Sequence, residues 1–98
     1  MIPQDLLTQI QALFPNTKVN QGKVIEVEIP IDQVRAMLVD DGVLILKNKN
    51  LDGIVIIWNG DRVEIRIGDE KNINVYDLQA VVYLIKSGDY YMLVFGDC

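Results

Sequence analysis

Three charged side chains lie near the two ends of one segment of the sequence, residues 51–71, and could support chemistry. Asp52 stands at the start of the segment, and Asp69 and Lys71 stand at its end. Carboxylate oxygens are the ligands that Mg²⁺ and Mn²⁺ prefer, and a lysine ammonium can offset the charge of a phosphate. If the segment folds back on itself, these side chains meet and could hold a divalent cation beside a phosphodiester.

The segment is predicted to be a β-hairpin, because two runs of β-branched residues surround Asn59-Gly60, a typical two-residue turn. This turn would pair Trp58 with Asp61 and Asp52 with Ile67. Directly opposed residues share a face of the sheet. The face that carries the candidate site would then hold Asp52, Ile54, Ile56, Trp58, Val63, Ile65 and Ile67, with Asp69 and Lys71 if the strand continues.

Composition excludes several kinds of active site. The chain has no histidine, a single serine (Ser87) and a single cysteine (Cys98). A Ser-His-Asp triad, a Cys-His dyad, a histidine base and a Cys/His zinc site are therefore ruled out, and no internal disulfide can form. Glycine-rich phosphate-binding motifs are also absent. Any chemistry must use carboxylates, lysine, arginine or tyrosine.

Length and charge describe a small acidic protein. The 98 residues predict one domain, 1–98, with a net charge of −5. This charge disfavours nucleic-acid binding, although bound divalent cations would partly cancel it near a site. The longest apolar run, Ala80–Ile85, is too short to span a bilayer, and the amino terminus lacks the features of a signal peptide. We expect an intracellular, cytoplasmic protein with no membrane partner.

The first half of the chain is predicted to form two helices and two strands. Residues 1–14 should form an amino-terminal helix whose apolar stripe contains Leu6, Leu7, Ile10, Leu13 and Phe14. Residues 22–98 should form a mixed-sheet core that begins with a strand at Lys23–Ile29. Asp32 can cap a second helix that runs to about Asp41 and ends at Gly42, before a strand at Val43–Leu46.

After the hairpin, a third helix and a last strand are predicted. Asn74 with Asp77 resembles a capping box for a helix from Asn74 to Lys86 that ends at Gly88. The same segment is rich in β-branched residues and could instead be a strand that pairs with the final strand, Tyr90–Phe95. The expected fold class is α/β, an α+β mixed sheet in the order α-β-[α-β-β-β-α-β]. A ferredoxin-like plan is the alternative, because strand, Asp-capped helix, glycine and strand occur in both halves.

From Ile31 onward, this order resembles the core of the PD-(D/E)xK nuclease superfamily. Asp52 opens the second core strand, Asp69-Glu70-Lys71 is a D-x-K sequence, and Gln79 falls in the next predicted helix. The resemblance implies that Asp52 and Asp69 ligate Mg²⁺ or Mn²⁺, that Lys71 orients the attacking water, and that Gln79 supports the site. The chain departs from the family pattern at Leu51, where proline is typical.

A rival alignment places the motif at Glu64-Ile65-Arg66, with arginine where the family has lysine. Arginine stays protonated, so it could neutralise a phosphate but not transfer a proton. Both motifs also have plain structural readings. Glu64 and Arg66 would be the exposed positions of an alternating strand, and Asp69-Glu70-Lys71 would be a charged loop.

Two functions follow from these observations. The first is a small metal-dependent nuclease, or an inactive nuclease-like domain, that uses Mg²⁺ or Mn²⁺ and acts on nucleic acid. The alternative is a non-catalytic, acidic protein-binding or oligomerisation module without a cofactor, whose partner is a basic protein or a second copy of the chain. In that case the apolar stripe of the first helix, outside the predicted core, is the expected interface.

Overall fold

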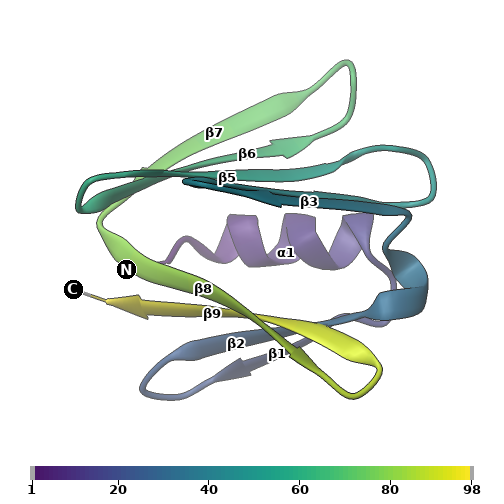
Figure 1. The fold of residues 1–98 in the computed structure, drawn as a ribbon, viewed down its shortest axis with the longest axis horizontal. Helices are drawn as coiled ribbons and strands as arrows, with labels where there is room; N and C mark the ends of the chain where they lie inside the picture. The colour runs from purple at the N-terminus through teal and green to yellow at the C-terminus, as the bar shows by residue number, and fades with distance from the viewer. Residues whose placement is uncertain (1, 98) are drawn as a thin grey trace.

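The chain folds into two antiparallel β-sheets that enclose one α-helix (Figure 1). The structure is a computed structural model that describes residues 2–97, with the side chains of residues 2–96; Cys98 lies outside this range. The elements are α1 (Gln4–Leu13), β1 (Lys18–Gln21), β2 (Ile25–Pro30), a 3-10 turn (Ile31–Gln33), β3 (Ala36–Asp40), β4 (Val43–Lys47), β5 (Gly53–Asn59), β6 (Arg62–Gly68), β7 (Ile73–Leu78), β8 (Ala80–Ser87) and β9 (Tyr90–Asp97).

The two sheets differ in width, and the chain crosses between them twice after α1. One sheet has four strands in the order β1-β2-β9-β8, and the other has five in the order β3-β4-β5-β6-β7. The 3-10 turn carries the chain from β2 to β3. A single residue, Gln79, separates β7 from β8, so the second crossing is a sharp corner. Within residues 2–97, no helix is both long enough and apolar enough to cross a membrane.

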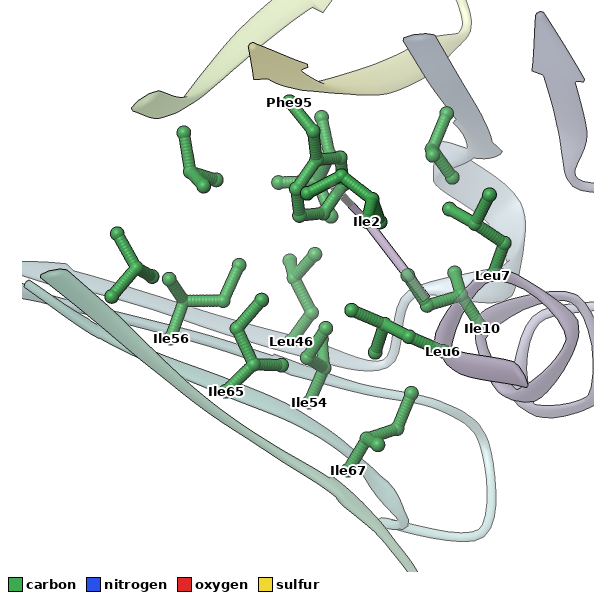
Figure 2. Close-up of a cluster of buried hydrophobic side chains, with 14 of the residues drawn as sticks. Ile2, Leu6, Leu7, Ile10, Leu46, Ile54, Ile56, Ile65, Ile67 and Phe95 are labelled. Carbon is green, nitrogen blue, oxygen red and sulfur yellow. The ribbon is translucent and has the colours of Figure 1, made fainter. Parts of the chain in front are cut away.

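The core lies between the inner faces of the sheets and is filled on one side by α1 (Figure 2). The apolar stripe of the first helix faces the core, with Leu6, Ile10 and Phe14 completely buried and Leu13 partly buried. Across from it, every second residue of the strands points inward, as the two-residue period of a strand requires. These inward residues include Leu44, Leu46, Ile54, Ile56, Ile65, Ile67, Leu93 and Phe95.

The predicted fold class is wrong: the fold is a β-sandwich with one helix, and neither the α-β-[α-β-β-β-α-β] order nor the ferredoxin-like alternative is present. The predicted helix from Asp32 to Asp41 is the 3-10 turn followed by β3. Gly42, expected to end that helix, instead turns the β3–β4 hairpin with φ +77°. A glycine with positive φ serves both helix ends and hairpins, so this signal did not distinguish them.

The predicted helix from Asn74 to Lys86 is also wrong, and the strand alternative holds for its second half. The segment forms β7 and β8, and β8 pairs with β9 through a turn at Gly88. Asn74 does not cap a helix, because its side-chain amide donates a hydrogen bond to Gln9 at 2.7 Å. The many β-branched residues pack well on a pleated sheet, and here this preference outweighed the apparent capping box.

Several local predictions are confirmed. The amino-terminal helix, the strands at β2, β4 and β9, and the hairpin are present. The hairpin turn lies one residue later than expected, since Asn59 pairs with Arg62 and Ile54 with Ile67. This register differs from the predicted one by two residues, so the side chains within β5 and β6 keep their predicted faces. β6 ends at Gly68, so Asp69 and Lys71 do not continue the strand. The proposed interface on the first helix is wrong, because that stripe is in the core.

Because α1 belongs to the core, shortening one of its buried side chains should destabilise the whole domain. We expect Ile10→Ala to lower the free energy of unfolding by about 2–5 kcal/mol, through lost burial and the cavity left behind. Chemical denaturation followed by Trp58 fluorescence measures this change. The control is Thr8→Ala on the exposed side of the same helix, which should change stability by less than about 0.5 kcal/mol. Equal effects of both substitutions would contradict a buried α1.

Candidate functional site

A hollow of about 330 Å³ lies on the outer face of the five-stranded sheet, where β5 begins and β6 ends. Its floor contains Gly53 and Gly68, which are paired directly across the two strands. Since neither residue has a side chain, the sheet surface is open at this point. The lining residues are Lys47, Leu51, Asp52, Gly53, Val55, Arg66, Ile67, Gly68, Asp69, Glu70 and Ile73. Both predicted metal ligands, Asp52 and Asp69, are among them.

Close backbone approaches require the two glycines of the floor. A Cβ atom at Gly53 would lie 1.9 Å from the carbonyl oxygen of Leu46. At Gly68 it would lie 1.9 Å from the carbonyl oxygen of Asn72, and φ is +148°. Such a φ strongly disfavours any residue with a side chain. The hollow is therefore a property of the backbone itself.

Asp52 is held by the tight turn that joins β4 to β5. The side-chain oxygen of Asn48 accepts hydrogen bonds from the amides of Asn50 at 2.9 Å and Asp52 at 3.0 Å. The side-chain amide of Asn48 donates to the carbonyl of Leu13 at 2.9 Å, which ties the turn to the end of α1. Leu51 has φ +66°. Proline, whose ring holds φ near −65°, cannot occupy that position, so the departure from the nuclease pattern there has a physical cause.

Asp69 uses its carboxylate to build the β6–β7 turn. Oδ1 accepts hydrogen bonds from the backbone amides of Lys71 and Asn72, both at 2.8 Å. Hydrogen bonds from Asn72 and then Lys71 hold the pKa of Asp69 below its ordinary value, because they favour the charged form. Lys71 is exposed and does not line the hollow. Among the described residues, no three histidine, cysteine or acidic side chains are grouped to hold a metal ion.

Gln79 lies at the opposite end of the sheet. Gly68 pairs with Ile73 at the end of β7 near the hollow, whereas Val63 pairs with Leu78 at the far end. The five-residue separation along β7 corresponds to about 17 Å. The structure thus brings Asp52 and Asp69 to one hollow, leaves Lys71 at its margin, and does not bring Gln79 to it.

The rival motif lies on the outer face of the sheet, as the alternation predicts. Glu64 and Arg66 are two residues apart on β6, and Arg66 Nη2 lies 3.0 Å from Glu64 Oε2. The two side chains are 35% and 53% exposed, so this ion pair adds little to stability. Its main effect is to neutralise two charges on the sheet surface.

The outer face of the five-stranded sheet carries a larger feature that the sequence analysis missed. Apolar side chains from β3, β4, β5 and β7 lie on this face, on either side of the charged outward positions of β6, and we call them together the outer β-face. It consists of Leu38, Val43, Ile45, Val55, Ile57, Ile73 and Val75, as the strand register shows. Leu38, Ile73 and Val75 are more than half exposed, and the others are half-buried.

A sequence signal for this face existed. Val43–Leu46 and Ile54–Trp58 are continuous apolar runs without alternation, a pattern typical of strands that are covered on both sides. Helices, rather than further strands of this sheet, were predicted at 32–41 and 74–86. Instead, these segments form β3 and β7, the edge strands of this sheet, and β8, an edge strand of the other sheet, so nothing in the described part of the chain covers the outer side.

Acidic side chains border the outer β-face at the end with the hairpin turns. Asp40 pairs with Val43, Asn59 with Arg62, and Glu64 with Asp77, which places these strand ends together. Four carboxylates, from Asp40, Asp41, Asp61 and Asp77, accompany one guanidinium, that of Arg62, which pairs with Asp77 at 2.8 Å. This border has a net charge of −3.

Comparison with known proteins yields no relative: no family model, no curated protein and no solved structure matches this chain. The nuclease resemblance depended on the order α-β-β-β-α-β, which the fold does not have. What stays in place from that prediction is the shared position of Asp52 and Asp69 beside the hollow. The face predicted for the site, that of Ile54 and Ile65, is the core face, and the hollow lies on the opposite face.

The glycine floor should tolerate no side chain. We expect Gly53→Ala to destabilise the protein by more than about 2 kcal/mol, because its Cβ would collide with the backbone of β4. The control is Gly22→Ala, where the nearest atom would lie at 3.9 Å and φ is not positive. That change should alter stability by less than about 0.5 kcal/mol in thermal and urea unfolding. A neutral Gly53→Ala would show that the floor is not tightly constrained.

The turn function of Asp69 predicts a pH dependence. Its folded-state pKa is lowered, so its contribution is fully present above the ordinary aspartate pKa, about 4, and is lost as the pH falls through the folded value. We expect Asp69→Ala to be less stable than wild type at pH 7 and to approach it below about pH 4. Urea unfolding of both proteins from pH 7 to pH 3 measures the difference. A difference that does not change with pH would contradict the assignment.

Proposed function

We propose that this protein is a non-catalytic protein-binding module that binds its partner through the outer β-face. The observation that carries the proposal is a set of seven exposed or half-buried apolar side chains, from β3, β4, β5 and β7, on one face of the five-stranded sheet. A group of apolar side chains on one exposed face usually marks a site of association, whereas isolated exposed apolar residues are ordinary. The face belongs to a hydrogen-bonded sheet, so binding would require little ordering of the backbone.

The charge around the face indicates the chemistry of the partner. The border with a net charge of −3 favours a partner whose apolar contact surface is flanked by lysine or arginine. The Glu64–Arg66 pair in the middle of the face is internally neutral, so it can be covered without leaving an unpaired charge. Salt should weaken binding mainly through the acidic border.

Four observations favour this function over a metal-dependent nuclease. One carboxylate oxygen of Asp69 already accepts hydrogen bonds from two backbone amides, and Lys71 does not line the hollow. Gln79 lies at the other end of β7. The acidic border repels a phosphate backbone. Binding through the outer β-face asks none of these residues to perform chemistry.

The test compares two matched pairs of substitutions. Ile73→Thr with Val75→Thr makes the outer β-face polar on β7, and threonine retains a high β-propensity. Ile85→Thr with Val81→Thr makes the same chemical changes on exposed positions of β8 in the other sheet. A partner is first identified by cross-linking in the source cells and then purified. We expect the β7 pair to weaken its binding at least about tenfold in calorimetry, and the β8 pair to leave it unchanged.

Two results would contradict the proposal. One is equal binding by wild type and the β7 double variant. The other is cleavage of plasmid DNA or structured RNA in Mn²⁺ that disappears in Asp52→Ala, which would favour a nuclease at the hollow.

A further inference from the structure

The four edge strands of the two sheets are protected to very different degrees. β1 is polar, with Lys18 and Asn20 exposed and Gln21 bonded to Gln4. β8 has its Val82 carbonyl covered by the indole N–H of Trp58 at 3.1 Å. On β7, Asn74 bonds to a side chain of α1 and Asp77 forms an ion pair. Edge strands are usually blunted in such ways, because their unpaired backbone groups can otherwise pair with another chain.

β3 has no such protection. Its first four residues, Ala36-Met37-Leu38-Val39, are apolar, and no lysine or proline interrupts them. All five residues of the strand are exposed. Met37 and Val39 point to the inner side of the sheet, opposite the buried Leu46 and Leu44, yet they are 41% and 65% exposed. The strand therefore presents apolar side chains on both of its faces together with a row of free backbone groups.

If the β3 strands of two copies pair, their flanking charges are opposite in sign only in an antiparallel arrangement. Arg35 precedes the strand, and Asp40 and Asp41 follow its apolar part. A two-fold axis at Leu38 would place Arg35 opposite the partner subunit's Asp41, and this contact would occur twice by symmetry. Opposed residues share a face, so the two side chains would be neighbours. A parallel arrangement would instead place like charges together.

Arg35 and Asp41 are available for such contacts. Both are exposed, and within residues 2–96 the ion pairs are Arg62–Asp77 and Arg66–Glu64. A separate protein offering a strand would have to match both the apolar residues and the charge order of β3. A second copy matches them automatically, which is why it is the occupant that the surface favours.

We propose that two copies of this protein associate through β3, antiparallel about Leu38, and join their five-stranded sheets into one. The outer β-faces of the two copies would then form a single wide surface. The interface adds one short strand pair and is smaller than a standard protein interface, so we expect a dimer with micromolar affinity. Leu38 belongs to both surfaces, but the inference can be tested separately from partner binding, since Ile73 and Val75 lie on β7, at the other edge of the sheet.

A charge-swap experiment tests the arrangement. Sedimentation velocity over a range of concentrations gives the dimer dissociation constant of wild type, Arg35→Glu, Asp41→Lys and the double variant. Each single substitution places like charges at both symmetric contacts, so we expect the constant to rise at least about tenfold. The double variant restores opposite charges and should return to within about threefold of wild type. Lys18→Glu makes the same charge change on the edge strand β1 and should have no effect.

Mixing supplies a second test that folding defects cannot imitate. Arg35→Glu and Asp41→Lys, each monomeric alone, should form a heterodimer when mixed, because opposite charges then meet at both contacts. A wild type that stays monomeric at millimolar concentration would overturn the inference. So would a dimer that the single substitutions leave intact, or single variants that fail to associate on mixing. The Ile73→Thr/Val75→Thr protein should dimerise normally, so failure of this inference and failure of partner binding are distinguishable.

Discussion

The arrangement of this protein depends on one constraint: its five-stranded sheet carries apolar side chains on both faces, and the described residues cover only one face. The inner face is buried by α1 and by the four-stranded sheet, with Ile54, Ile56 and Ile65 completely enclosed. Burial of such side chains is the dominant favourable contribution to folding. The outer face receives no such cover, although Val55 and Ile57 lie there between charged neighbours. The surfaces on which the proposed associations depend are consequences of this asymmetry.

The sequence predicted local periodicity better than it predicted how the elements combine. The apolar stripe of α1, the face of every residue in the β5–β6 hairpin and the strands β2, β4 and β9 follow from patterns of 3.6 or 2 residues. The segments 32–41 and 74–86 failed for a shared reason. Each has an acidic or amide residue at its start and a glycine at its end, signals that fit a helix and a hairpin equally. The choice between them depended on pairing with β4, β6 and β9, which local patterns do not contain.

The candidate site shows the same division. That Asp52 and Asp69 lie at one end of the sheet could be predicted, because they stand at the two open ends of one hairpin. The sequence did not show that Asp69 is committed to the β6–β7 turn, or that Gln79 lies on the corner between β7 and β8. The glycine floor was also hidden, because Gly53 and Gly68 are adjacent only once the register is known. A catalytic motif requires several elements to be placed correctly at once. Because the helix predicted to carry Gln79 is absent, Gln79 lies at the far end of the sheet from the hollow.

The edge strands differ in how well they are protected against pairing with another chain, and β3 is the least protected. In a domain that stays monomeric, a lysine or a proline in β3 would prevent this strand from pairing with another chain, as such residues do on other sheet edges. In this chain the polar residues are on β1, the indole of Trp58 covers β8, and the side chains of α1 reach β7. The apolar strand β3 joins the apolar outer β-face through Leu38, which belongs to both surfaces. A strand pair at β3 would bury part of Leu38 and extend the face beyond it, so the two surfaces support each other physically.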